Sequence, residues 1–307
     1  NISMRILVTG GAGYIGSHCV RSLIIKGHQP IIIDNLENGN LEIVKEQLKV
    51  PLIISNIGNK KILNEVIQGT HPLLKGTIHE NKLIEGVIHF AAYAYVGESI
   101  KNPLKYYENN VQESIILLES ICSEICIAKR DDNSPIPIIF SSSCATYGIP
   151  KKNPITEAID QKPISPYGKS KLIIENLIKD MSLSCGLKSV IFRYFNAAGA
   201  AEDGTLGELH EPETHLIPLV LRAALGMQKN IEIFGDEFPT FDGTCIRDYI
   251  HVVDIADAHA LALDFFLKDK SKDKVKIYNL GSEKGFSVME IIKYVEEITN
   301  KDVPYKV

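Results

Sequence analysis

The feature that most constrains the fold is a glycine-rich turn near the start of the chain. A short apolar run, Arg5 to Thr9, leads into Gly10-Gly11-Ala12-Gly13-Tyr14-Ile15-Gly16, and a helical pattern follows from Ser17 to Ile25. Glycines spaced in this way allow a tight turn and a close approach of backbone to a pyrophosphate, which then lies at the helix N-terminus. A strand, a glycine turn and a helix in this order predict a dinucleotide-binding α/β unit.

The end of the next apolar strand indicates which dinucleotide binds. Ile31-Ile32-Ile33 ends at Asp34, 21 residues after Gly13. A carboxylate at this place bonds the 2′-hydroxyl of a ribose and repels a 2′-phosphate. Since no lysine or arginine occurs between Asp34 and Lys45, the sequence predicts NAD rather than NADP as the cofactor.

Strands and helices alternate up to about residue 195. Further apolar strands are expected at 51–54, 87–92 and 136–140, with a helix at 59–68 and a long helix at 103–127. The alternation predicts an α/β fold with a doubly wound parallel (Rossmann) sheet, whose ligands lie at the carboxyl ends of the strands. We expect an NAD-binding domain over 1–195 and a smaller substrate-binding region over 196–307, of which 246–281 packs back on the first domain.

A second motif places a tyrosine and a lysine on one face of a helix. Ser165 is a good N-cap and Pro166 fits the first helical position, so Tyr167 and Lys171 lie one turn apart. A phenolate at pH 7 costs about 4 kcal/mol, and a cation about 4 Å away returns about 1 to 4 kcal/mol, depending on the local dielectric. Lys171, helped by a bound cofactor cation, could therefore make Tyr167 a usable base.

Composition argues against several other classes of protein. The chain has 307 residues, 45% of them hydrophobic, and a net charge of −5, without the basic stripe of a nucleic-acid-binding surface. No apolar run reaches the roughly 18 residues needed to span a membrane, and no signal-peptide pattern precedes the first strand. The six cysteines and nine histidines show no redox or metal-binding spacing. We therefore expect a reduced cytoplasmic protein with no metal, no membrane association and no nucleic-acid partner.

A set of segments spread over the chain is more specific than any single motif. They are Thr9 to His18, His89 to Ala92, Val96 to Ser99, Ser141 to Ser143, Ser165 to Lys171, Arg193 to Asn196 and Gly243 to Val252. Together they resemble the extended short-chain dehydrogenase/reductase family, and within it most closely the UDP-glucose 4-epimerases (UDP-galactose 4-epimerases). The resemblance implies a tightly held NAD that is reduced and reoxidised within each turnover, while C4 of a UDP-hexose is inverted through a transient 4-keto sugar.

The resemblance also implies the roles of individual residues. Tyr167 would take the proton of the sugar 4-hydroxyl, Lys171 would hold the nicotinamide ribose and lower the tyrosine pKa, and Ser143 would bond the sugar 4-oxygen. The implied cofactor contacts are Gly10, Gly13, Tyr14, Ile15, Gly16, Asp34, Asn35, Asn38, Gly39, Asn56, Ile57, Phe90, Ala91, Ala92, Asn109, Ser141, Tyr167, Lys171 and Phe195. The implied substrate contacts are Ser143, Tyr167, Asn196, His215, Leu216 and Arg247. The family further implies a homodimer formed through the helices at 103–127 and 167–183.

Some positions depart from the family pattern. Ala94 stands where a relative has a lysine, Asn56 where an aspartate often bonds the adenine, and His215 where an asparagine lies beside the diphosphate. The family pattern also continues beyond the position of Val307 with an arginine-rich segment that closes over the nucleotide. Which UDP-sugar is preferred therefore stays open.

There are five alternatives to this function. Three keep the same chemistry on another substrate, namely UDP-arabinose or UDP-xylose, UDP-glucuronate, or an N-acetylated UDP-sugar such as UDP-GlcNAc. The fourth is a nucleotide-sugar 4,6-dehydratase, which is disfavoured because Cys144 and Ala145 replace the acid/base pair that follows its catalytic Ser/Thr. A non-catalytic NAD-binding regulator on the same fold would have no reason to keep the serine, the tyrosine and the lysine in register.

Overall fold

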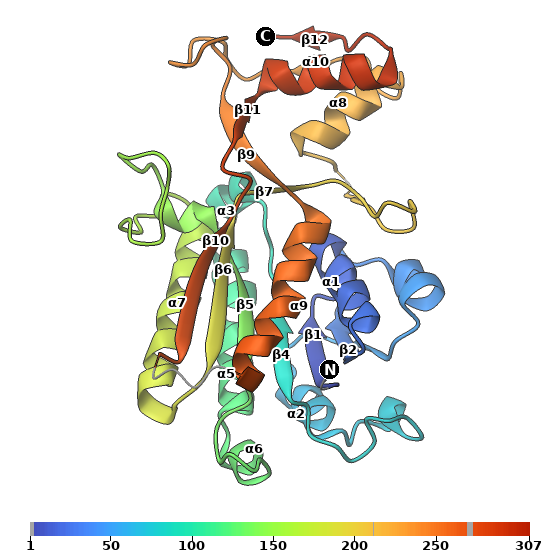
Figure 1. Ribbon diagram of the computed structural model, residues 1–307, viewed down its shortest axis with the longest axis vertical. Helices are drawn as coiled ribbons and strands as arrows, with labels where there is room; N and C mark the ends of the chain where they lie inside the picture. Colours follow the sequence, from blue (N-terminus) through green and yellow to red (C-terminus); the bar gives the residue numbers. More distant parts are fainter. Residues whose placement is uncertain (1–2, 211, 269–272) are drawn as a thin grey trace.

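A seven-stranded parallel sheet forms the centre of the computed structural model, which describes residues 3–210, 212–268 and 273–307 (Figure 1). Its strands lie in the order β10-β6-β5-β4-β1-β2-β3. Their bounds are β1 Arg5–Thr9, β2 Gln29–Asp34, β3 Leu52–Ile54, β4 Gly86–His89, β5 Ile138–Ser143, β6 Ser189–Tyr194 and β10 Val275–Leu280. The strand order reverses between β1 and β4, so the carboxyl ends of these strands form the crevice where such sheets bind ligands. The predicted doubly wound α/β fold is confirmed.

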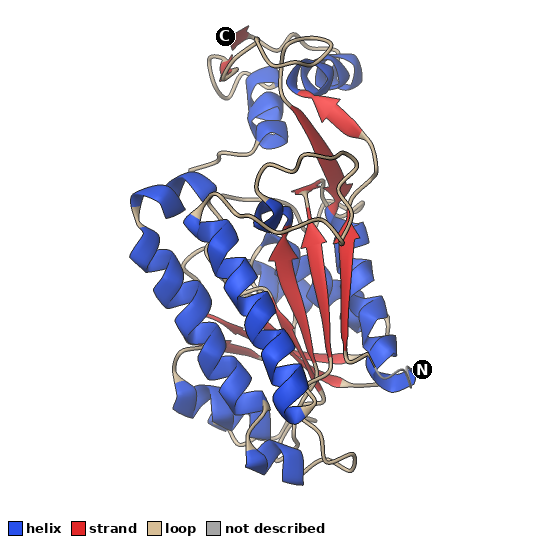
Figure 2. Ribbon diagram, turned by 90° about the vertical axis from the view of Figure 1, so that its left-hand side faces the viewer, coloured by secondary structure: helices blue, strands red, loops and turns tan. Residues whose placement is uncertain are grey.

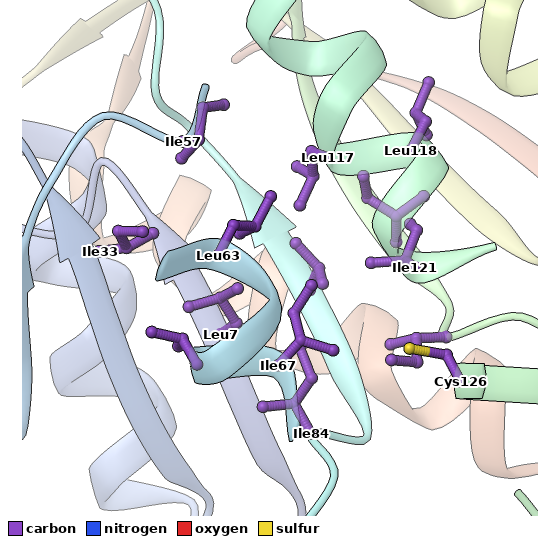
Figure 3. Close-up of a cluster of buried hydrophobic side chains, with 14 of the residues drawn as sticks. Leu7, Ile33, Ile57, Leu63, Ile67, Ile84, Leu117, Leu118, Ile121 and Cys126 are labelled. Atoms are coloured by element: carbon purple, nitrogen blue, oxygen red, sulfur yellow. The ribbon is translucent and has the colours of Figure 1, made fainter. Parts of the chain in front are cut away.

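Helices cover both faces of this sheet (Figures 1 and 2). The helices α2 (Lys60–Gln68), α5 (Glu113–Ile121) and α7 (Pro166–Cys185) bury apolar side chains against one face, and α1 (Tyr14–Ile25) and α9 (Val252–Lys268) against the other. Figure 3 shows part of the first layer, in which Leu7 of β1 and Ile33 of β2 pack near Leu63 of α2 and Leu117 of α5. In the described part of the chain, no helix is long and apolar enough to cross a bilayer.

The long helix predicted over 103–127 is interrupted. It consists of α4 (Pro103–Tyr106), a π-helical stretch η3 (Tyr107–Gln112) and α5, and it ends at Cys122. Ser123 then starts α6 (Glu124–Ala128), because its hydroxyl accepts a hydrogen bond from the amide of Cys126 at 3.4 Å. Other short helices are η1 (Ile43–Leu48), η2 (Pro72–Leu74), α3 (Val96–Lys101) and η4 (Cys144–Tyr147).

A smaller set of elements lies beyond the carboxyl edge of the sheet, in the upper part of Figure 1. Its strands are β7 (Asn196–Ala198), β9 (Ile246–His251) and β11 (Gly285–Ser287) in one sheet, and β8 (Ile231–Glu232) with β12 (Tyr305–Lys306) in another. Its helices α8 (Leu216–Ala224) and α10 (Val288–Thr299) share a separate apolar core. Between these elements the chain returns through α9 to β10, which pairs with β6 at the edge of the large sheet. The division into domains at residue 195 stays a prediction.

Candidate active site

The turn between β1 and α1 is so tight that glycine is required at two places. Gly10 has a φ of +70°, and a Cβ there would lie 2.7 Å from the backbone nitrogen of Ala91. At Gly16, a Cβ would lie 2.2 Å from the carbonyl oxygen of Gly10. The turn therefore lies directly against the chain that follows β4, at the crevice of the sheet.

The N-terminus of α1 is suited to an anion. Gly13 is the N-cap and makes no side-chain capping bond, and the first turn of the helix contains no acidic residue. The amides of Tyr14 and Ile15 begin the helix, so they have no carbonyl partner within it and lie at the positive end of its dipole. This helix end fits the pyrophosphate of NAD.

Asp34 ends β2 beside this turn, and two amides fix its carboxylate. Oδ2 accepts from the amide of Ala12 at 3.0 Å, and Oδ1 accepts from the amide of Leu36 at 2.8 Å. Gly39 packs directly on the same carboxylate. Burial raises the pKa of Asp34, and the two amide hydrogen bonds oppose this rise.

A cleft of about 820 Å³ opens next to Asn35, the residue after Asp34. Three predicted cofactor contacts, Asn35, Asn56 and Asn109, line it together. Its volume lies within the range of sites for small molecules and cofactors. The predicted contact Asn38 is exposed, whereas Ile57 is buried in the core and does not line this cleft.

Helix α7 begins as the sequence predicts. The hydroxyl of Ser165 accepts a hydrogen bond from the amide of Gly168 at 3.1 Å, and Pro166 occupies the first turn. This start fixes Tyr167 and Lys171 one helical turn apart on the same helix.

The structure brings Tyr167, Lys171 and Ser143 together at the carboxyl end of β5. Lys171 Nζ donates to the carbonyl oxygen of Ser141 at 2.8 Å and lies 5.9 Å from the centre of the Tyr167 ring. The side chain of Ser143 lies close enough to the Tyr167 hydroxyl to oppose the rise in its pKa. A phenol with an ammonium and a hydroxyl nearby can move a proton to and from a substrate oxygen. Their catalytic roles stay predictions.

Burial sets the acidity of the phenol and the ammonium. Burial raises the pKa of Tyr167 to about 12, and the nearby Ser143 side chain opposes this rise. Burial lowers the pKa of Lys171 to about 7, and the charge of Glu175 opposes this change. The groups of the protein therefore keep the phenol protonated at pH 7, and Tyr167 needs a further positive charge nearby to act as a base.

A buried ion pair, which the sequence analysis did not predict, lies behind these residues. Arg193 and Glu175 are 2% and 0% exposed and make two bonds, Nε to Oε1 at 3.0 Å and Nη2 to Oε2 at 2.6 Å. Glu175 also accepts from the hydroxyl of Ser142 at 2.5 Å, and Arg193 donates to the hydroxyl of Tyr147 at 2.8 Å. The available sequence signal was the spacing of Glu175, one helical turn beyond Lys171.

The predicted substrate contacts Asn196 and Arg247 lie on neighbouring strands of the small sheet. The side-chain amide of Asn196 donates to the carbonyl oxygen of Asp248 at 2.8 Å, so part of this side chain joins β7 to β9. Arg247 is exposed. Burial raises the pKa of Cys144 to about 11, and the charge of Arg247 opposes this rise. The charge of Arg247 is therefore felt at Cys144, the residue after Ser143.

Four titratable side chains meet directly before α8. Glu208, His210, Glu213 and His215 bring one ligand atom each to within 4.8 Å of one another. His215 is the N-cap residue of α8, and Leu216 begins the helix. Sequence analysis missed this group because Glu-x-His-x-x-Glu-x-His matches no familiar metal-binding spacing. The signal that was available is the density of such residues in a short loop.

The remaining predicted cofactor contacts lie at the carboxyl edge. Phe90, Ala91 and Ala92 follow β4, and Phe195 follows β6. The ring of Phe90 lies 4.8 Å from that of the buried His259, so part of its surface belongs to the core. Each of these residues is near the crevice, and its contact with the cofactor stays a prediction.

The chain matches a known family over most of its length. The model of the NAD dependent epimerase/dehydratase family matches residues 6–281. The chain belongs to this family. The predicted NAD cofactor is confirmed by this match, and it agrees with the glycine turn and the open N-terminus of α1.

Individual members of the family are similar over nearly the whole chain. The UDP-glucose 4-epimerase of Rhizobium meliloti is 44% identical over 297 residues, which cover 97% of this chain and 82% of that protein. The crystal structure of UDP-glucose 4-epimerase from Brucella ovis in complex with NAD has a TM-score of 0.86 at 42% identity and covers 99% of this chain and 85% of that one. The enzyme from Bifidobacterium longum in complex with NAD+ and UDP has a TM-score of 0.84 at 35% identity, covering 98% and 85%. The predicted resemblance to UDP-glucose 4-epimerases is confirmed.

Proposed function

We propose that this chain interconverts UDP-galactose and UDP-glucose with Tyr167, Ser143 and Lys171 as catalytic residues. The family and the similar proteins make it an NAD-dependent UDP-hexose 4-epimerase. The assignment of the catalytic residues rests on one observation, the meeting of Tyr167 with Ser143 and Lys171 at the carboxyl edge of the sheet.

The reaction needs one proton and one hydride to leave the sugar and to return. When bound, NAD supplies the hydride acceptor and a positive charge. Tyr167 removes the proton of the 4-hydroxyl as C4 loses its hydride, and it returns a proton to the oxygen of the 4-keto sugar after the hydride reaches the other face. Ser143, whose side chain lies beside the Tyr167 hydroxyl, bonds the same sugar oxygen. Lys171 stays beside the phenol because the carbonyl of Ser141 holds its ammonium.

The UDP moiety is proposed to lie against the smaller set of elements. An exposed guanidinium at Arg247 can pair with two oxygens of a diphosphate. Asn196, His215 and Leu216 are proposed to contact the same part of the substrate. A related epimerase crystallised with UDP supports a UDP site in this fold.

The central experiment is product analysis with the NAD-loaded protein and UDP-galactose. We expect UDP-glucose as the product, and a Tyr167→Phe variant should keep its NAD while losing about 10²–10⁴-fold in rate, because proton transfer is removed. Tyr305→Phe makes the same chemical change at an exposed tyrosine on β12. It is the matched control and should keep full activity.

The same assay distinguishes the alternatives. Faster conversion of UDP-arabinose, UDP-glucuronate or UDP-GlcNAc would move the proposal to that sugar, and a 6-deoxy-4-keto product would indicate a dehydratase. Unchanged UDP-galactose, or an unaffected Tyr167→Phe variant, would contradict the proposal.

We also propose a cytoplasmic homodimer that pairs through the layer of α4, α5 and α7. Helix α7 packs against both α4 and α5, and Leu104 of α4 is 72% exposed. Sedimentation at micromolar concentration should show a dimer, and Leu104→Glu should weaken its association. A monomer in the unchanged protein would contradict the proposed dimer. The cytoplasmic location is supported by the unpaired thiols of all six cysteines, each of which lies in a described range.

A further inference from the structure

We infer that Glu208, His210, Glu213 and His215 bind a divalent transition-metal ion of the zinc class. His215 Nδ1 lies 2.9 Å from Glu208 Oε1 and 2.9 Å from Glu213 Oε1. His210 Nδ1 lies 3.2 Å from Glu208 Oε1 and 3.8 Å from Glu213 Oε2. Four ligands about 2.0–2.2 Å from a tetrahedral zinc are about 3.3–3.6 Å apart, so small shifts would complete such a site.

Two buried atoms of the cluster lack a well-aligned hydrogen-bond partner. The Glu213 side chain is 1% exposed, and its Oε1 is anchored by the amides of Thr214 and His215 at 2.8 Å each. Its Oε2 is buried without a hydrogen-bond partner, and Nδ1 of His210, which lies opposite, forms no well-aligned hydrogen bond although Glu208 Oε1 is 3.2 Å away. A buried carboxylate oxygen facing an imidazole nitrogen is costly unless a cation or a proton lies between them.

The charge of the cluster supports the same conclusion. The side chains of Glu208 and Glu213 are 9% and 1% exposed, so two carboxylates are largely removed from water. Within residues 3–210, 212–268 and 273–307, no lysine or arginine forms an ion pair with either carboxylate. With both imidazoles neutral, as metal ligation requires, the cluster carries two negative charges, which one divalent cation balances.

The ligand types favour one class of ion. Magnesium and calcium prefer oxygen ligands alone, whereas imidazole suits zinc and its neighbours in the first transition row. Two imidazoles and two carboxylates also fill all four positions of a tetrahedral ion, which is typical of a structural rather than a catalytic site.

The position of the cluster suggests what the ion would hold. The His210 ring lies 6.4 Å from the ring of Tyr14, in the first turn of α1, and 6.0 Å from that of Tyr95. His215 is the N-cap of α8. An ion here would join the loop before α8 to the side of the pyrophosphate turn. Its effect on UDP binding rests on the proposed function, whereas its presence does not.

The test is metal binding to the NAD-loaded protein after treatment with a chelator. Equilibrium dialysis against ZnCl2, and separately MgCl2, should give one zinc ion per chain and no retained magnesium. Co2+ added instead should give visible d–d absorption that zinc abolishes, and the Tm should rise with the logarithm of the zinc concentration once this exceeds the Kd.

Variants locate the ion. Glu213→Gln and His210→Ala should lose the bound zinc and the cobalt absorption, and Glu42→Gln, an exposed glutamate on another element, should keep both. If the unchanged protein binds no zinc or cobalt, or if the variants bind them as well as Glu42→Gln does, the inference is wrong and protons balance the cluster. Zinc binding by a protein that leaves UDP-galactose unchanged would keep the metal site and reject the enzymatic proposal.

Discussion

Two buried clusters of charged side chains border the proposed reaction site, and they differ in how their charge is balanced. On β6 and α7, Arg193 and Glu175 pair one cation with one anion, and neighbouring side chains use their remaining polar atoms. In the loop before α8, two carboxylates meet two imidazoles, and Glu213 Oε2 and His210 Nδ1 are left without well-aligned hydrogen-bond partners.

The difference separates scaffold from binding site. The Arg193–Glu175 cluster is complete before any ligand binds, so it belongs to the framework that holds α7, and with it Tyr167 and Lys171, against the sheet. The cluster before α8 is incomplete in the protein alone. Changes that break the first cluster should therefore cost stability under all conditions, whereas changes in the second should depend on metal.

The largest expected effect comes from breaking the balanced cluster. Arg193→Met leaves the carboxylate of Glu175 buried without its cation, so we expect a loss of about 3–5 kcal/mol in the free energy of unfolding. Urea unfolding of NAD-saturated protein, followed by circular dichroism, measures this loss. The double variant Arg193→Met/Glu175→Met should recover much of it, because no buried charge remains unpaired.

An exposed ion pair provides the matched control. Arg21 and Asp203 make a comparable two-bond contact at 34% and 47% exposure. Arg21→Met should lose much less than Arg193→Met, since water screens the pair. Equal losses of unfolding free energy for the two arginine variants would show that burial does not increase the contribution of the Arg193–Glu175 pair to stability.

The sequence predicts a region well when the residues that determine it are neighbours in the chain, and poorly when they come from distant segments. The glycine turn and the start of α7 depend on neighbouring residues, so their spacing revealed both Asp34 and the Tyr167–Lys171 pair. Arg193 and Glu175 come from a strand and a helix, and only the folded sheet shows that they meet. The interruption at Cys122 was missed because the apolar pattern continues through it, whereas the Ser123 cap decides the helix boundary.

A second prediction concerns Lys171, whose buried amino group lies one helical turn before Glu175 of the balanced cluster. Its folded pKa, about 7, is below the unfolded value, so its contribution to stability is complete above about pH 10.5 and is lost as the pH falls toward 7. Lys171→Met should abolish activity because it removes a proposed catalytic residue. It should also raise the free energy of unfolding of the NAD-free protein by about 0.5–2 kcal/mol at pH 7, because it removes a buried ammonium. The gain should shrink as the pH rises toward 10.5.

Thermal unfolding over this pH range, with Lys169→Met as the control, tests whether Lys171→Met raises or lowers stability. Lys169 is an exposed lysine on the same helix, so its replacement should give no pH-dependent gain. A Lys171→Met variant that is less stable than the parent at pH 7 would show that the hydrogen bond to Ser141 outweighs the cost of burying the ammonium.

The smallest change in stability without metal is expected for Glu208→Gln, and its informative property is how it responds to zinc. In chelator-treated protein, Glu208→Gln removes one of two like charges and loses a hydrogen bond to His215, so the free energy of unfolding should change by less than about 1 kcal/mol. With zinc present, the same variant should lose the whole metal-dependent gain in Tm, because one ligand is missing. Glu175, the carboxylate of the balanced cluster, should show the reverse pattern when changed to Gln: a large loss that zinc does not alter. If both glutamates respond alike to zinc, the two clusters do not differ in the way that their hydrogen bonds indicate.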